Sequence, residues 1–196
     1  MVEVPRTPSD DDQRVVIHGV SWSQYEAIRE RTDHIPGLRL TYLEGALEIM
    51  SPSSRHELLK KLIARLLEVY ALERDIDLVG AGSTTFRSPE VERALEPDEC
   101  YCLGTYREPP DLAIEVVLTT GGLDKLAVYR GLGVLEVWQW RADRFQVWRL
   151  GAEGYAEVGR SQVLPALDLE DLAIFVRMPE QPAAVRAFRD RLRARR

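Results

Sequence analysis

The chain has 196 residues, of which 45% are hydrophobic and 30% are charged, and its formal net charge at pH 7 is −6. This length and composition are typical of one globular domain with a sizeable core. No apolar run approaches the roughly 18 residues of a membrane span, and no signal peptide is recognised, so we expect a cytoplasmic protein without a membrane segment. The acidic balance argues against a broad duplex-binding surface, because such binding depends on neutralising phosphates.

The two ends of the chain differ in composition from its middle. Residues 1–14 are polar and contain prolines, which predicts a disordered tail, and residues 15–178 are then expected to form a single domain. Residues 179–196 predict a basic tail or helix, because seven arginines fall between positions 177 and 196. This cluster either contacts DNA or forms a solvated helix end, and the sequence leaves both interpretations open.

The first predicted elements are a helix and a hairpin. Ser21 and Gln24 have the spacing of a capping box, so a helix is expected to begin after Ser21. Alternating residues at 39–49, with Glu44-Gly45 near the turn, predict a β-hairpin that serves as a platform. Glu48 lies on this hairpin and is a candidate accessory residue of a site.

The longest predicted helix spans residues 55–74 and carries an apolar stripe at helical spacing. Ser54 and Glu57 have the spacing of a capping box, and a carboxylate in the first turn also suits the helix dipole. That is the structural interpretation of Glu57. In the functional interpretation, His56 or Glu57 faces an active site, so both are candidate accessory residues.

The segment after this helix is less informative. Residues 77–87 predict a strand with glycine bends, and residues 88–94 predict a polar connection. Gly80-Ala81-Gly82 lacks the lysine and serine that end a phosphate-binding loop, so no nucleotide site is expected there.

Two predicted strands, at residues 98–103 and 111–118, place carboxylates in an apolar setting. Glu115 stands in the middle of a nearly all-aliphatic strand, where a carboxylate is costly unless it is paired or bound to a cation. Asp98 lies on the neighbouring strand, and directly opposed residues on adjacent strands are only ~4.5–5.5 Å apart. Asp111 shares the strand and face of Glu115 but lies about 13 Å away, too far to hold the same ion.

Asp98 and Glu115 are therefore the candidate metal ligands. Converging carboxylates suit a hard divalent ion such as Mg²⁺ or Mn²⁺, and Mg²⁺ keeps bound waters for chemistry. Lys125 follows behind Gly121-Gly122 on a short predicted helix that ends at Gly131, a suitable C′ residue. This helix can carry Lys125 back over the strand ends, so Lys125 is the third candidate catalytic residue.

Cys100 and Cys102 lie two residues apart on one predicted strand. Their side chains share a face about 6–7 Å apart, which is poor geometry for a disulfide, and two thiols alone do not make a zinc site. We expect buried free thiols in a reducing cytosol.

A meander of three strands is predicted at residues 134–140, 145–150 and 155–158, followed by a helix at 169–175 that begins after Asp168. Strands at the edge of such a meander are open to pairing, so we expect a homodimer. Trp138, Trp140 and Trp148 either stack on bases or, as is more common at a spacing of two, belong to the core.

The spacing of these motifs resembles the PD-(D/E)xK nuclease superfamily, through Pro97-Asp98, Glu115 and a downstream lysine. Within it, the chain resembles the Uma two family of restriction-endonuclease-like proteins over roughly residues 20–175. The matching stretches are LEIMSPSSRHE at 47–57, EPDECYCL at 96–103, PPDLAIEV at 109–116 and LDKLAVYRGLGVLEVW at 123–138. The resemblance implies an α/β fold with a restriction-endonuclease-like core, a mixed sheet flanked by helices, a hairpin platform and an edge meander.

One departure from the superfamily pattern concerns the lysine. Val117 stands two residues after Glu115, where the pattern has lysine, and the resemblance implies that Lys125 takes over that role. The favoured function is a metal-dependent endonuclease that acts on DNA. The alternatives are a weakly active or inactive nuclease-fold module that binds nucleic acid or a partner protein, and a structural metal-binding domain.

Overall fold

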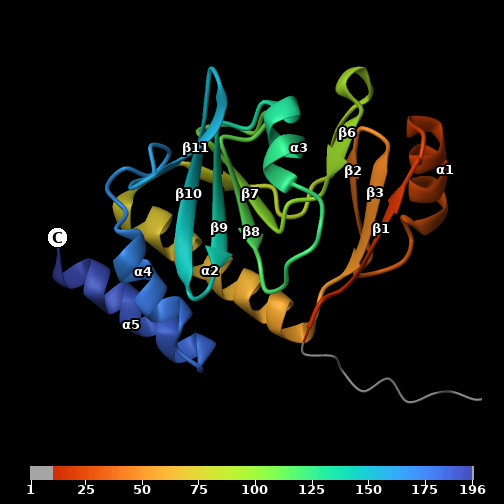
Figure 1. The fold of residues 1–196 in the computed structure, drawn as a ribbon. Helices are drawn as coiled ribbons and strands as arrows, with labels where there is room; N and C mark the ends of the chain where they lie inside the picture. Colours follow the sequence, from red (N-terminus) through yellow and green to blue (C-terminus); the bar gives the residue numbers. More distant parts are fainter. Residues whose placement is uncertain (1–10, 196) are drawn as a thin grey trace, which may run out of the picture.

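A computed structural model describes residues 11–195, so the predicted disorder of residues 1–10 lies outside the described part. In that part the chain forms two β-sheets and five α-helices (Figure 1). This arrangement confirms the predicted α/β class with a mixed sheet flanked by helices.

The first sheet is antiparallel and contains the predicted hairpin platform. Its strand order is β1-β3-β2-β6-β5. The strands are β1 Gln13–His18, β2 Arg39–Leu43, β3 Ala46–Ser51, β5 Phe86–Ser88 and β6 Arg93–Leu95. Helix α1 (Trp22–Thr32) begins with the predicted capping box of Ser21 and Gln24, and packs against this sheet through Tyr25, which stacks on Tyr42.

The second sheet is mixed and forms the centre of the molecule, with strand order β11-β10-β9-β8-β7-β4. The strands are β4 Leu78–Gly80, β7 Glu99–Leu103, β8 Leu112–Val116, β9 Glu136–Arg141, β10 Arg144–Gly151 and β11 Gly154–Val158. Only β8 and β9 pair in parallel among these described strands, and helix α3 (Lys125–Leu132) makes the crossover between them.

Helices cover the second sheet on both faces (Figure 1). The largest core lies between one face and the helices α2 (Ser54–Arg74), α4 (Leu169–Val176) and α5 (Gln181–Ala194). Helix α3 packs between the two sheets, where Val128 and Tyr129 contact apolar residues of both. Among residues 11–195 no helix is long and apolar enough to cross a membrane.

The N-terminal boundary differs from the prediction. Gln13 and Arg14, which fall in the predicted tail, begin β1 and pair with Ser51 and Met50 of β3. Asp12 just before them is buried. The composition of residues 1–14 hid this, because a polar edge strand looks like a tail until its partner is known.

Two helix ends also differ from the prediction. The N-cap of α2 is Ser53, whose hydroxyl accepts from the His56 amide, so the predicted capping box of Ser54 and Glu57 does not form. Helix α3 ends at Leu132 with Gly133 as its left-handed cap (φ 77°), and the predicted C′ residue Gly131 stays helical. A Cβ at Gly131 would meet the side chain of Arg93, which lies against this turn of the helix.

The predicted strand at residues 77–87 is wrong. It divides into β4 and β5, which belong to different sheets, and the chain crosses from one sheet to the other between them. The predicted polar connection at 88–94 contains a short 3₁₀ helix (Pro89–Val91) and the start of β6. A single apolar stretch gives no indication of which sheet each half joins.

Candidate active site

Two neighbouring strands bring Asp98 and Glu115 together. Strands β7 and β8 are antiparallel with Glu99 opposite Ile114, so one further step in this register places Asp98 opposite Glu115. The amide of Val116 donates to Asp98 Oδ2 at 2.6 Å, which fixes the carboxylate against β8. Asp98 and Glu115 are each only 1% exposed. The cross-strand pair expected from the sequence is therefore present in the geometry of the hairpin.

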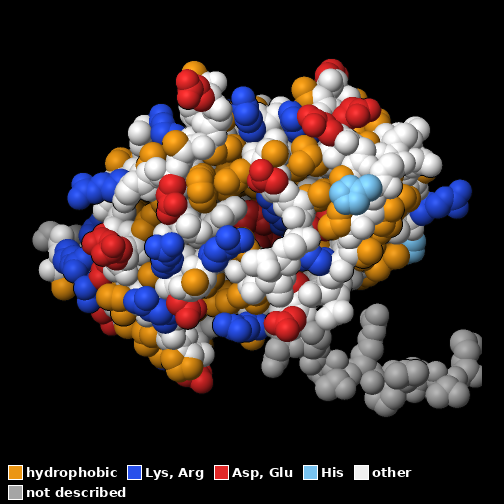
Figure 2. All heavy atoms as spheres, viewed as in Figure 1, with side chains coloured by type: hydrophobic (Ala, Val, Ile, Leu, Met, Phe, Trp, Pro, Cys, Tyr) orange, Lys and Arg blue, Asp and Glu red, His pale blue; other side chains and the backbone are white. Residues whose placement is uncertain are grey.

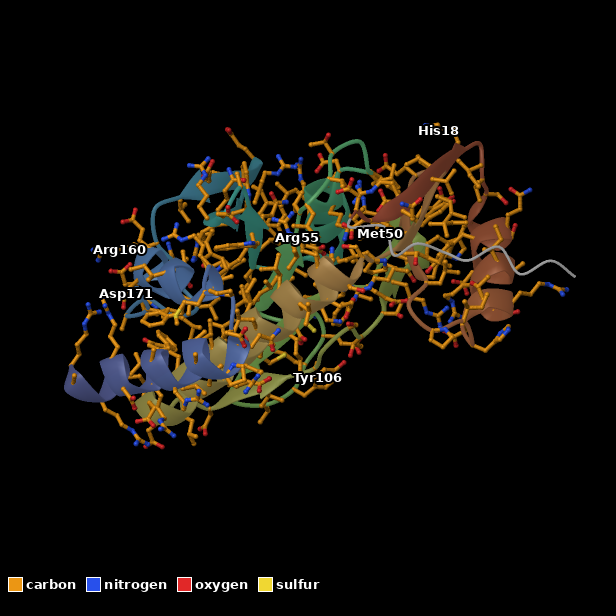
Figure 3. The ribbon with its side chains drawn as sticks, turned by 90° about the horizontal axis from the view of Figure 1, so that it is seen from below. His18, Met50, Arg55, Tyr106, Arg160 and Asp171 are labelled. Carbon is orange, nitrogen blue, oxygen red and sulfur yellow. The ribbon has the colours of Figure 1, made fainter. Side chains whose placement is uncertain are left out.

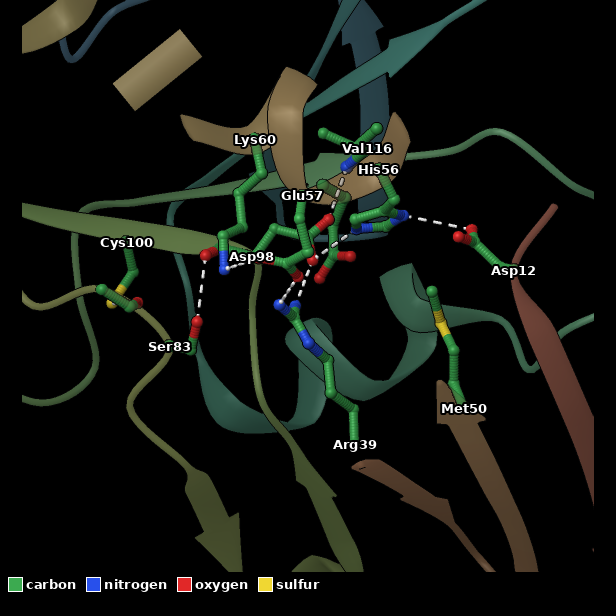
Figure 4. Close-up of polar contacts among 12 residues, drawn as sticks. Asp12, Arg39, Met50, His56, Glu57, Lys60, Ser83, Asp98, Cys100 and Val116 are labelled. Carbon is green, nitrogen blue, oxygen red and sulfur yellow. Dashed lines mark hydrogen bonds and ion pairs between the residues drawn. The ribbon is translucent and has the colours of Figure 1, made fainter. Parts of the chain in front are cut away.

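Asp98 is held by two basic side chains from other elements (Figure 4). Arg39 of β2 donates to Oδ1, and His56 of α2 approaches the same oxygen through Nε2 at 2.9 Å. Burial alone would raise the pKa of Asp98, but the hydrogen bond from His56 and the surrounding positive charges lower it below its ordinary value. Asp98 is therefore a carboxylate anion.

His56 is completely buried and lies between two carboxylates (Figure 4). Its Nδ1 is 3.1 Å from Asp12 Oδ2, and its Nε2 faces Asp98. Burial lowers the pKa of His56, but the hydrogen bonds to Asp12 and Asp98 outweigh it and raise the pKa to about 9. The ring is then an imidazolium that donates from both nitrogens.

Sequence reasoning missed Asp12. It accepts from the Ser53 amide at 2.9 Å as well as contacting His56, so it fixes the beginning of α2 and the histidine together. The composition of residues 1–14 places Asp12 in the predicted tail, and nothing in the acidic run before β1 distinguishes this residue from its neighbours. Only the pairing of β1 with β3 brings it to the site.

Glu115 receives its donors from α3. Lys125 Nζ donates to Oε2 at 2.5 Å, and the hydroxyl of the buried Tyr129 donates to Oε1. The two donors lie four residues apart, so they share one face of the helix. The structure thus places the predicted lysine beside the predicted glutamate, and it adds Tyr129, which helical spacing from Lys125 could have indicated.

The charges of this pair depend on burial. Burial raises the pKa of Glu115, and Lys125 opposes this shift while Asp98 adds to it. Burial lowers the pKa of Lys125, but Glu115 and Asp98 outweigh it and the net shift is upward. The lysine is therefore an ammonium at neutral pH, and its side chain keeps 17% exposure, so it reaches the surface of the site.

The accessory candidates occupy different positions. Glu57 is 45% exposed and pairs with Arg39 at 2.8 Å and with Lys60 at 2.9 Å, so it reaches Asp98 only through the arginine. Glu48 is buried and accepts from the Leu123 amide at 2.8 Å, which holds the loop before α3. It contributes to the negative potential at Lys125.

Three other acidic or thiol residues do not contact Glu115 or Lys125 through any hydrogen bond. Asp111 accepts from the Leu103 amide at 2.8 Å and from Arg107, so it closes the turn between β7 and β8. Cys100 and Cys102 are buried free thiols, and burial raises the pKa of Cys100 to about 12.

The C-terminal arginines are engaged in ion pairs within the fold. Arg191 and Arg195 pair with Asp171 of α4 at 2.5 Å and 3.0 Å, and Arg193 pairs with Glu73 of α2 at 2.7 Å. Figure 3 shows Asp171 at the end of the molecule opposite β1, on which His18 is labelled. These contacts favour the interpretation of this segment as the end of a packed helix.

A cleft of about 300 Å³ opens beside Glu115 and Lys125. It is lined by residues of β1, β8, β9 and β10 and by the loop that precedes α3, including Arg14, Thr119, Gln139, Arg141 and Trp148. Figure 2 shows a hollow on this face with acidic atoms in its depth and Lys and Arg side chains around its rim. Trp148 lines the cleft, whereas Trp138 and Trp140 are buried in the core.

The two central carboxylates have the donor chemistry for a hard divalent cation. No group of three or more His, Cys, Asp or Glu side chains within residues 11–195 is arranged to hold a metal ion. Mg²⁺ does not require such a group, because it binds through one or two carboxylates together with waters and substrate phosphates. Asp98 and Glu115 supply that donor type, and in this structure all four of their oxygens accept hydrogen bonds from the protein.

Comparison with protein families places the chain in one of them. The family model Uma2, described as a putative restriction endonuclease, matches residues 22–177. The matched region includes Arg39, His56, Asp98, Glu115 and Lys125, and excludes Asp12 and all of α5. No curated protein matches the chain.

Proposed function

The chain belongs to the Uma2 family of putative restriction endonucleases, and from this premise we propose that it is a metal-dependent endonuclease that hydrolyses DNA phosphodiester bonds. The family match agrees with the restriction-endonuclease-like fold and with a nuclease-like function. The dependence on Mg²⁺ or Mn²⁺ and the choice of DNA as the substrate are our proposals.

One observation carries this proposal. The buried Glu115 lies 2.5 Å from the partly exposed Lys125, both line the cleft, and the anionic Asp98 stands opposite Glu115 on the adjacent strand. A pair of carboxylates that could hold a divalent cation, beside an ammonium, suits phosphodiester hydrolysis, since the cation and the ammonium would offset the negative charge that develops on the phosphate oxygens.

Each residue has a distinct proposed role. Asp98 and Glu115 would hold Mg²⁺ or Mn²⁺, which supplies a Lewis acid and lowers the pKa of an attacking water. Lys125 would orient that water or stabilise charge on the phosphate oxygens. Arg39 and His56 keep Asp98 anionic and fixed in orientation, and Asp12 fixes His56 in turn.

The test is cleavage of plasmid and single-stranded DNA with Mg²⁺ or Mn²⁺, against EDTA. Lys125→Ala should lower the metal-dependent rate about 10²–10³-fold, which is the usual effect of removing one preorganised charge-stabilising group. Lys61→Ala is the matched control, because Lys61 is an exposed lysine on α2 that does not line the cleft. Equal rates for wild type and Lys125→Ala would contradict the role of Lys125.

A second candidate function is a nucleic-acid-binding module without nuclease activity. It is favoured by the donors around the two carboxylates: all four oxygens of Asp98 and Glu115 already accept hydrogen bonds within the protein. Val117 also stands where the superfamily pattern has its lysine. A wild type that binds DNA but cleaves none with either metal would establish this alternative.

We also propose a homodimer, through an open sheet edge. Strand β11 is the last strand of the second sheet and pairs only with β10 in the described part of the chain. Such an edge presents free backbone donors and acceptors to a second copy. Sedimentation at micromolar concentration should show a dimer, and a monomer alone would reject this proposal.

A further inference from the structure

The cleft carries two arginines that the proposed chemistry does not use. Arg14 enters it from β1 of the first sheet, and Arg141 enters it from the end of β9 in the second sheet. Both therefore share one cleft with Glu115 and Lys125, although they are far apart in the sequence and come from different sheets. The hollow shown in Figure 2 lies on this face.

Arg14 is poorly satisfied by the protein. Its side chain is only 19% exposed, yet its nearest carboxylate oxygen, on Glu48, is 3.8 Å away. Its other contact is to the sulfur of Met50 at 3.8 Å, and its Nε has no hydrogen-bond partner among residues 11–195. A guanidinium has five donors in a planar fork, so this side chain retains capacity for an oxyanion.

Arg141 has an unfavourable neighbour. In the hairpin of β9 and β10 it stands directly opposite Arg144, and like charges in that position destabilise an antiparallel pair. The parallel pairing of Val116 with Trp140 places Arg141 one residue beyond the end of the β8–β9 ladder, next to Val117. A bound anion at the cleft would relieve the repulsion between Arg141 and Arg144.

We propose that Arg14 and Arg141 bind backbone phosphates of a polynucleotide strand that lies in the cleft between the two sheets. This inference rests on the proposed function, because it takes the strand to be the substrate of the Glu115–Lys125 site. Bidentate binding of phosphate by arginine is favoured by its geometry, and Trp148 in the same cleft offers an aromatic surface near a base. A small basic site also agrees with the acidic net charge of −6, since few phosphates need to be contacted.

The experiment measures binding without cleavage. A fluorescently labelled 12-nucleotide single-stranded DNA is titrated with protein in EDTA, by anisotropy, over a series of salt concentrations. Arg14→Ala and Arg141→Ala should each weaken binding about tenfold, the size expected for one charge-assisted contact. Each should also make the negative slope of log K against log salt shallower by about 0.7, the value for one phosphate on a single strand.

The controls separate charge from folding. Arg31→Ala changes an exposed arginine on α1, which does not line the cleft, and should bind like wild type. Arg14→Lys keeps the charge and should recover part of the affinity. If thermal melting shows that Arg14→Ala does not fold, Arg141→Ala still tests the inference, because Arg141 is exposed at a hairpin.

The outcomes for the two proposals are distinct. A protein that binds the strand through these arginines but never cleaves would contradict the proposed function, including the strand's role as substrate, and would support the phosphate contacts of Arg14 and Arg141. A protein that cleaves, while both variants keep wild-type affinity and salt slope, would overturn the inference alone. Absence of any binding by wild type in EDTA would also overturn it.

Discussion

Two buried glutamates on neighbouring parallel strands are held by different kinds of donor. Glu136 of β9 accepts from Trp138 Nε1 at 2.7 Å, from the Ser161 hydroxyl at 2.5 Å and from the Gln162 amide at 2.8 Å. All three donors are neutral, and Glu136 is completely buried. Its hydrogen bonds to Ser161 and Gln162 connect the segment after β11 to the central sheet.

Glu115 of β8 is equally buried but is bound differently. One of its donors is the ammonium of Lys125, the other is Tyr129, and the glutamate lines the cleft. The comparison shows that burial of a carboxylate within an apolar strand does not identify a catalytic group. What distinguishes the two is the charge of the donors and access from solvent.

The same substitution at both positions should have the largest and most opposite effects. Glu115→Gln removes a charge that the proposed mechanism needs, so metal-dependent cleavage should fall at least about 10²–10³-fold. Its stability should fall as well, because the Lys125 ammonium loses its buried counter-charge, so activity is the readout that separates it from the Glu136 variant. Cleavage assays and thermal melting of the two glutamine variants measure the contrast, and full activity in Glu115→Gln would reverse it.

The histidine beside Asp98 predicts a pH dependence of stability. The pKa of His56 is raised from 6.5 to about 9 in the folded state. Its contribution to the free energy of unfolding is therefore fully present below pH 6.5 and is lost as the pH rises to about 9. The loss amounts to about 3 kcal/mol, from 1.36 kcal/mol per pKa unit.

Urea unfolding of the metal-free protein between pH 6 and pH 9.5 measures this loss. His56→Gln should be less stable at pH 6 and should show a flatter dependence across the window. An identical slope in wild type and variant would show that His56 is not an imidazolium in the folded protein. In that case the surroundings of Glu115 would carry less charge than we infer, and would differ less from the neutral surroundings of Glu136.

The sequence predicted the central hairpin and the position of its carboxylates well, for a local reason. Strands β7 and β8 are consecutive in the sequence and antiparallel, so Asp98 and Glu115 come to face each other within one hairpin, across the connection at residues 104–111. The position of Lys125 could also be predicted, because a helix that follows Gly121-Gly122 can carry the lysine back over the strand ends. Local spacing was sufficient for these three residues.

The rest of the site depends on pairing across long stretches of sequence. Asp12 and Arg39 reach the site only because the first sheet packs against the beginning of α2, and no local pattern encodes this. Glu136 shows the converse difficulty. It is flanked by Leu135 and Val137 much as Glu115 is flanked by Ile114 and Val116, yet its donors are neutral and structural.

Glu136→Gln should lower stability and spare activity. A glutamine has a single acceptor oxygen, so one of the three donors that now face the carboxylate must lose its partner or meet the amide NH₂ group. The free energy of unfolding should fall by about 1–3 kcal/mol, the cost of leaving a buried donor unsatisfied. Chemical denaturation measures the change, and cleavage at a temperature where the variant is folded should match wild type.

The smallest expected effect tests whether the neutral donor of Glu115 contributes to catalysis. Tyr129→Phe removes the hydroxyl that donates to Oε1 and leaves the Lys125 contact in place. Since Tyr129 is completely buried, the ring keeps its packing, and stability should fall by only about 1 kcal/mol. Because the ammonium remains, cleavage should fall less than about tenfold, well below the effect of Lys125→Ala. The comparison variant Ser161→Ala removes one neutral donor from Glu136 and also the acceptor of the Leu164 amide, so it should lower stability more than Tyr129→Phe without changing the rate. A loss of activity in Tyr129→Phe as large as in Lys125→Ala would mean that the two donors of Glu115 act as one unit, and that the ammonium alone does not distinguish this glutamate from Glu136.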